Sequence, residues 1–89
     1  MPRFLAIHSV PGITEEEFRH ALSEARRWRP DGRATILKVY CDLGRGKLFS
    51  ECEAPEQAQF EEWIRVLGWS YDAIYNVDLV QQSGRFWKL

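Results

Sequence analysis

The chain has 89 residues, the length of one small domain and too short for two hydrophobic cores. Its 45% hydrophobic and 28% charged residues exclude disordered and low-complexity proteins. Twelve Lys and Arg against 13 Asp and Glu leave a net charge of -1, so no overall field attracts nucleic acid or an anionic membrane surface. We therefore expect neither a nucleic-acid-binding protein nor a membrane protein.

The N-terminal stretch does not have the composition of a secretory signal. Arg3 and His8 interrupt the apolar residues of the first ten positions, and no apolar run approaches the roughly 20 residues that span a bilayer. Cys41 and Cys52 are too few for a disulfide scaffold and do not have the spacing of a zinc ribbon. These features predict a cytoplasmic protein with two reduced thiols.

The first half of the chain predicts a strand, a helix and a second strand. Residues 4–10 form an apolar run that ends at the turn signal Pro11-Gly12. Thr14 and the glutamates after it form a helix capping box, and the helix is expected to end at residues 30–32. Its apolar stripe is Phe18, Ala21, Leu22 and Ala25. Arginines in its last turn complement the helix dipole. Alternation over residues 35–42 predicts the second strand.

The second half predicts a hairpin, a helix and a last strand. A loop at residues 44–46 joins the second strand to a third at residues 48–53. Pro55 occupies a first helical position, and Gly68 ends the helix. The apolar stripe of this helix is Phe60, Trp63, Ile64 and Leu67. Residues 73–80 alternate as a strand, and the aromatic tail at 81–89 is expected to dock on the sheet edge or on a second copy.

The element order β-α-β-β-α-β predicts an α+β fold of the ferredoxin-like type. Such a fold has a four-stranded antiparallel sheet with two helices on one face, because each crossover is right-handed. We expect one domain over residues 1–80, followed by the tail at 81–89.

The faces of the predicted strands lead to the candidate site. We expect the helices to cover the apolar side, which consists of Leu5, Ile7, Leu37, Val39, Cys41, Tyr75, Val77 and Leu79. A hairpin register that places Ser50 opposite Tyr40 then gathers polar side chains on the uncovered side. The candidate ligand-binding residues there are His8, Tyr40, Ser50 and Asn76. The candidate metal donors are His8, Asp42, Cys52 and Asp78. Such a surface also predicts a homodimer.

Several short motifs are spread along the chain, namely His8-x-x-Pro11-Gly12, Thr14-x-Glu16, Gly46-Lys47-x-Phe49 and Glu53-Ala54-Pro55, with Gly68 and Val77. Together they resemble a family of small ferredoxin-like bacterial domains of unknown function that includes nickel-binding members. The resemblance implies a dimeric domain with a divalent-metal site in which His8 takes part. Ser50 stands where the family often has Cys, and Ile64 where it often has His, so two soft donors are missing.

Three classes of function remain open from the sequence. The first is a dimeric accessory protein that binds a small ligand or a metal such as nickel on the uncovered face. The second is a cofactor-independent enzyme of the dimeric α+β-barrel type with a pocket on that face. The third is a structural or regulatory interaction module. No nucleophile turn accompanies the possible pairing of His8 with Ser50 or Cys52, so no residue is assigned a catalytic role.

Overall fold

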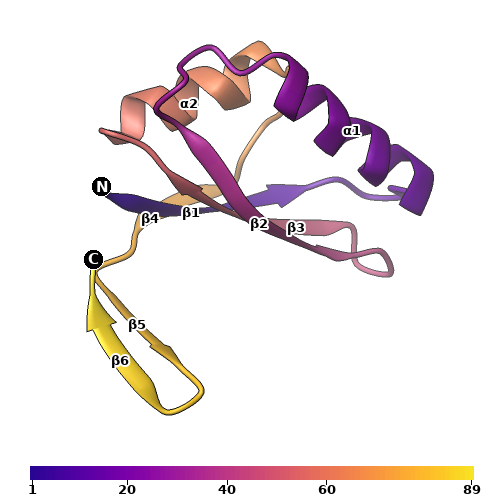
Figure 1. Ribbon diagram of the computed structural model, residues 1–89. Helices are drawn as coiled ribbons and strands as arrows, with labels where there is room; N and C mark the ends of the chain where they lie inside the picture. The colour runs from indigo at the N-terminus through magenta and orange to yellow at the C-terminus, as the bar shows by residue number, and fades with distance from the viewer.

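The computed structural model describes residues 1–89 and contains two helices and six strands (Figure 1). In chain order these are β1 (Arg3–Ser9), α1 (Glu15–Arg27), β2 (Thr35–Asp42), β3 (Lys47–Glu53), α2 (Gln57–Val66), β4 (Ala73–Asn76), β5 (Leu79–Gln82) and β6 (Arg85–Lys88). Strands β1 to β4 form an antiparallel sheet in the order β2-β3-β1-β4, with both helices on one side. Neither helix is long and apolar enough to cross a membrane. The predicted α+β class is confirmed.

Both helices begin at side-chain caps. The hydroxyl of Thr14 accepts the Glu17 N–H at 3.1 Å, and the Glu17 carboxylate accepts the Thr14 N–H at 3.0 Å, so the predicted capping box is confirmed. The start of α2 lies later than predicted, at Gln57 and not at Pro55. Glu56 is the cap residue, and its N–H donates to the Gln59 side-chain oxygen at 2.8 Å.

The loop between β2 and β3 has four residues, one more than predicted. Its first turn is held by Asp42, whose carboxylate accepts the Arg45 N–H at 3.1 Å. Gly46 ends the loop with a positive φ of 63°, and the Val10 N–H donates to its carbonyl at 2.7 Å. A Cβ at this position would lie 2.6 Å from the Cα of Pro11. The backbone conformation and the lack of space both require glycine here.

This longer loop shifts the pairing of β2 with β3 by one residue. Tyr40 lies opposite Phe49, and Val39 lies opposite Ser50. The predicted pairing of Ser50 with Tyr40 is therefore wrong, and a shift of one residue moves every side chain of a strand to the other face. Ser50 and Cys52 point toward the helices and are fully buried.

The predicted faces of β1 are also reversed. Phe4, Ala6 and His8 are buried under the helices, whereas Leu5 and Ile7 lie on the uncovered side. Both sides of this strand carry apolar residues, so its alternation does not decide which one is covered. On the covered side, His8 finds hydrogen-bond partners in Ser50 and Ser70. The rings of Phe60 and Trp63 from α2 fill the core together with the small residues Ala6, Ala25, Ala34, Cys52 and Ala54.

Strand β2 follows its predicted alternation except at one point. Val39 and Cys41 are partly buried, as expected, but Leu37 is exposed because the pairing with β3 shifts between Ile36 and Lys38. This bulge places one extra residue in the edge strand and turns Leu37 outward. Ile36 packs against the core in its place.

The predicted last strand is divided in two. Strand β4 ends at Asn76, whose side chain donates to the Asp78 carboxylate at 2.6 Å. The chain then forms the hairpin β5-β6, whose turn residues Ser83 and Gly84 both have positive φ, as a two-residue hairpin turn requires. The predicted inward positions of Tyr75 and Leu79 are wrong, since both side chains are exposed.

The hairpin β5-β6 stands apart from the rest of the molecule. It pairs with no strand of the four-stranded sheet and projects on the side of the sheet away from the helices (Figure 1). Leu79 is 69% exposed and Phe86 is 80% exposed. The aromatic tail is therefore part of this hairpin, residues 79–88, which we call the hairpin arm. It does not pair along the sheet edge.

Candidate functional site

The structure brings together only two of the four predicted ligand-binding residues. His8 on β1 and Ser50 on β3 are in contact beneath the helices. Tyr40 points away from them on the uncovered face, and Asn76 is exposed at the end of β4. The predicted cluster on the uncovered face therefore does not form, because His8 and Ser50 lie on the sides of β1 and β3 that face the helices.

His8 is held by hydrogen bonds at both ring nitrogens. Its Nδ1 lies 2.8 Å from the Ser70 carbonyl oxygen, and its Nε2 lies 2.8 Å from the Ser50 hydroxyl. A carbonyl can only accept, so Nδ1 carries the proton, and in the neutral ring Nε2 accepts the Ser50 O–H. Burial lowers the pKa of His8, which favours this neutral form. Trp69 packs edge-on against the imidazole, with ring centroids 5.4 Å apart.

The direction of these hydrogen bonds is that of a general base beside a hydroxyl nucleophile. Access decides against that chemistry, because Ser50 is 0% exposed and His8 is 1% exposed. A cavity of about 190 Å³ adjoins the imidazole, but Ser50 does not line it. The pair instead links β1 to β3 and to the segment that leads from α2 to β4, and each polar atom that it buries has a partner.

The four predicted metal donors do not converge. Asp42 lies beside the hairpin loop, Cys52 is buried opposite Phe4, and Asp78 follows β4. No group of three or more His, Cys, Asp or Glu side chains is arranged to hold a metal ion. Both nitrogens of His8 are already engaged, and its burial keeps a second copy from reaching it. These residues do not fit a nickel centre.

Cys52 is not accessible to a metal ion from the surface, because it is fully buried. Burial raises the pKa of its thiol to about 12, which favours the neutral thiol. The thiol donates to the backbone oxygen of Glu53 at 3.4 Å. Cys52 is a core residue.

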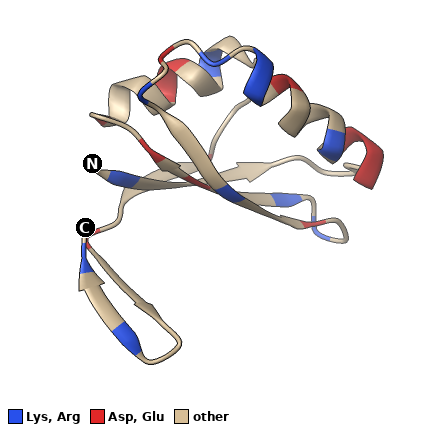
Figure 2. Ribbon diagram, viewed as in Figure 1, with Lys and Arg blue, Asp and Glu red and all other residues tan.

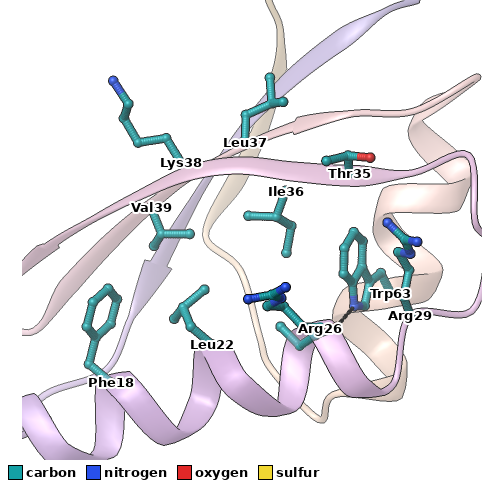
Figure 3. A pocket seen from close by; sticks show the side chains of 11 residues that line it. Phe18, Leu22, Arg26, Arg29, Thr35, Ile36, Leu37, Lys38, Val39 and Trp63 are labelled. Carbon is teal, nitrogen blue, oxygen red and sulfur yellow. Dashed lines mark hydrogen bonds between the residues drawn. The ribbon is translucent and has the colours of Figure 1, made fainter.

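A larger cavity lies elsewhere, as a groove of about 620 Å³ between α1 and β2 (Figure 3). Phe18 and Leu22 rise from α1 toward Ile36 and Val39 on β2, and Trp63 from α2 closes the inner side. The remaining lining residues are Ala25, Arg26, Arg29, Thr35, Leu37 and Lys38. Ligand clefts in proteins commonly have volumes of roughly 300–1,000 Å³ and apolar walls.

The groove exists because the edge strand and the first helix do not fill the space between them. The bulge at Leu37 turns that side chain outward, which leaves Ile36 and Val39 as the inward residues of this part of β2. Phe18 and Leu22 remain only partly buried, although both belong to the apolar stripe of α1. Apolar surface is thus left uncovered in the one part of the helix layer that faces the edge strand.

The two ends of the groove differ in polarity. Phe18 and Val39 form an apolar end, whereas Arg29 and Thr35 stand at the other end beside Trp63, with Arg26 between Leu22 and Trp63 (Figure 3). The indole N–H of Trp63 donates to the Ala25 carbonyl at 2.9 Å, so it is not available to a ligand. Lys38 lines the groove, but its amine points away and lies 5.5 Å from the centroid of the Tyr40 ring.

The two arginines have no acidic partners. The Arg26 side chain forms no hydrogen bond or ion pair, and the Arg29 side chain forms one hydrogen bond, of 3.3 Å, to the Ala34 carbonyl. The ion pairs of this protein use other cations, on residues Arg3, Arg19, Arg33, Lys47 and Arg65. The polar end of the groove therefore carries positive charge that nothing in the chain neutralises.

Sequence reasoning attributes the arginines to the helix dipole and misses this site. One signal is visible in the sequence, because Arg26 follows Leu22 by four residues and so continues the apolar stripe of α1. The bulge that opens the groove leaves no such signal, since it depends on the pairing between two strands.

Comparison with known proteins shows a likeness of fold. No family model and no curated protein matches the chain. A solved structure, described as the crystal structure analysis of SCO4226 from Streptomyces coelicolor A3(2), is similar with a TM-score of 0.81 and 20% sequence identity. The likeness covers 89% of this chain and 99% of that chain. At this identity it shows that the two proteins share an α+β fold.

Proposed function

We propose that this chain is a ferredoxin-like accessory domain that binds a small molecule between α1 and β2 and associates as a homodimer. The strand order β2-β3-β1-β4, with both helices on one side, supports the assignment to the ferredoxin-like type. A nickel centre is not part of this proposal, because the donor residues do not fit one. The hydroxyl of Ser50 is buried and so is not accessible to a substrate.

The observation that carries ligand binding is the groove itself. Its volume is about 620 Å³, and seven of its 11 lining residues are hydrophobic. Leaving such apolar surface in water is unfavourable by roughly 25 cal/mol for each Å². A ligand that covers it recovers this free energy, and the arginines supply a polar attachment point.

A thermal-shift screen of a small-molecule library tests ligand binding. A compound that binds only the folded protein raises the unfolding midpoint. We expect compounds that stabilise the native chain and have no effect on Leu22→Trp, in which the indole fills the groove. Ser23→Trp is the matched control, because Ser23 is the exposed neighbour of Leu22 and does not line the groove. Stabilisation that persists in Leu22→Trp would place the ligand elsewhere and contradict the proposal.

Dimerisation is supported by the uncovered face of the sheet. Directly paired residues form a row across four strands, in the order Ala73, Ile7, Phe49 and Tyr40. Tyr75 adds a second exposed aromatic ring beside Leu5. An apolar row of this kind is typical of surfaces that are covered by a partner, and a second copy supplies an equivalent row.

The hairpin arm supports the same arrangement. It projects on the uncovered side of the sheet, and Leu79 and Phe86 lie on one of its faces. The strands of the arm carry Arg85 and Lys88 and no acidic residue (Figure 2). Glu51 and Glu53 lie on the uncovered side of the sheet, where both pair with Arg3, at 3.1 and 2.9 Å. One arginine against two carboxylates leaves a net negative charge there for a partner's arm.

Light scattering after size exclusion measures the mass in solution. We expect a dimer for the native chain and a monomer for Phe49→Lys and for Phe86→Ser. Gln81→Ser is the control, because Gln81 is paired with Phe86 on the same face of the arm but is polar. A native chain that remains monomeric at high micromolar concentration contradicts dimerisation and leaves ligand binding untouched.

A further inference from the structure

We propose that the ligand of the α1–β2 groove is an amphipathic monoanion, an unbranched or aryl-terminated carboxylate whose acid group binds Arg26 and Arg29. This inference rests on the proposed ligand-binding function and names its ligand class. The carboxylate lies at the arginine end of the groove, and the apolar body extends toward Phe18 and Val39 (Figure 3).

Charge is the first argument for this ligand class. Arg26 and Arg29 have no carboxylate partner within the chain, and none of the 11 lining residues is acidic. A guanidinium offers up to five N–H donors in a fork that matches the two oxygens of a carboxylate. The Thr35 hydroxyl at the same end adds a donor of a different kind. A cationic ligand would meet repulsion there, and a neutral one would form no charge pair with the arginines.

Length is the second argument. Eight residues of helix separate Phe18 from Arg26, which corresponds to a rise of about 12 Å. Four residues of strand separate Val39 from Thr35, which corresponds to about 13 Å. Both walls therefore run for similar distances from an apolar end to a polar end. An extended hydrocarbon chain of about ten carbon atoms covers such a span.

The hairpin arm of a second copy is a poorer occupant of the groove. Strands β5 and β6 carry two cations and no acidic residue, so their charge is the same as that of the groove's polar end (Figure 2). Charge complementarity directs the arm to the uncovered face of the sheet and a small anion to the groove.

Calorimetric titration with three decyl compounds tests the inference. Decanoate, 1-decanol and decylammonium share one apolar chain and differ in the charge of the head group. We expect decanoate to bind more tightly than decanol by about tenfold, and decylammonium to bind most weakly. Added salt should weaken decanoate binding and leave decanol binding unchanged, because only the first involves a charge pair.

Variants of the arginines locate the head group. We expect Arg26→Gln and Arg29→Gln each to weaken decanoate binding by about tenfold and to leave decanol binding unchanged. Arg27→Gln is the control, because Arg27 lies 5.2 Å from the centroid of the Trp28 ring and does not line the groove. All three arginines are exposed, so the variants are expected to fold with an unchanged unfolding midpoint.

The outcomes separate this inference from the proposed function. Equal affinity for decanoate and decanol, or equal losses in all three arginine variants, would overturn the inference and leave ligand binding in place. Groove binding by library compounds without binding of decanoate would do the same. If neither the library nor any decyl compound binds in the groove, both proposals are wrong.

Discussion

The space between the helices and the sheet is filled on one side of the molecule and open on the other. Over β1 and β3, Phe60 and Trp63 are at least 97% buried and belong to one core with Phe4, Ala6 and Cys52 of the sheet. Over β2, Phe18 and Leu22 from α1 face Ile36 and Val39 across the groove. The difference shows how an 89-residue chain divides its apolar residues. The filled side stabilises the fold, and the open side is available to a ligand.

Equivalent phenylalanine substitutions on the two sides give the largest expected effect. Phe60→Ala removes a ring that is 1% exposed and should lower the free energy of unfolding by about 3–5 kcal/mol. Phe18→Ala removes a ring that is only partly buried and should lower the free energy of unfolding by about 1 kcal/mol. Urea unfolding measures both. Losses of similar size would mean that the groove is part of the packed core.

Removing the partner of His8 should have the next largest effect. Ser50→Ala leaves Nε2 of the buried imidazole without a donor, so we expect a loss of about 1–3 kcal/mol in the free energy of unfolding. Ser70→Ala serves as the control, since Ser70 takes part through its backbone carbonyl, which the substitution retains. An unchanged stability in Ser50→Ala would show that the hydrogen bond does not contribute to the filled side.

The same histidine should make stability depend on pH. Because burial lowers the pKa of His8 in the folded state, the unfolded state binds more protons below its own pKa of about 6.5. Stability is therefore complete above that value and falls as the pH drops below it, by at most about 1.4 kcal/mol per pH unit. Urea unfolding between pH 7.5 and 5 should show this decline in the native chain and not in His8→Leu. A decline of equal size in His8→Leu would assign it to another group.

The two cysteines give a smaller, kinetic comparison of the two sides. Cys41 lies on β2 and is partly exposed, whereas Cys52 is buried and the pKa of its thiol is raised to about 12. We expect a thiol reagent at pH 8 to modify one cysteine, Cys41, in the native protein and both after unfolding. Peptide mapping identifies the site. Prompt modification of Cys52 would show that the filled side opens readily.

The positions of the helices and strands were easier to predict than the side of each strand that the helices cover. Local signals, such as the Thr14 capping box and the alternation that marks β2, do not depend on the rest of the chain. The capping box is confirmed, and the strand forms at residues 35–42 as predicted, with its alternation broken only at the bulge. The facing of β3 depends on one extra loop residue after Asp42, and the facing of β1 goes with hydrogen-bond partners of His8 that lie on other segments. Neither can be read from the strands themselves.

The candidate site was predicted only in part, and the reason is the same: its remaining features depend on how the elements assemble. His8 and Ser50 do come together, because Ala6 pairs with Ser50 and His8 lies two residues further along β1, but they meet on the covered side. Arg26 is visible as an extension of the α1 stripe. The groove depends on a bulge at Leu37 and on the packing of Trp63, and both arise only when the strands and helices are assembled.

The most direct test of the contrast between the two sides is an amide NMR titration of the native chain with decanoate. We predict that the largest chemical-shift changes map to the α1 and β2 residues of the groove, with Leu22, Ile36 and Arg29 among them. The amide chemical shifts of His8, Ser50 and Trp69 should not change. Changes centred on His8 and its 190 Å³ cavity, or no saturable changes at all, would contradict the assignment of ligand binding to the open side.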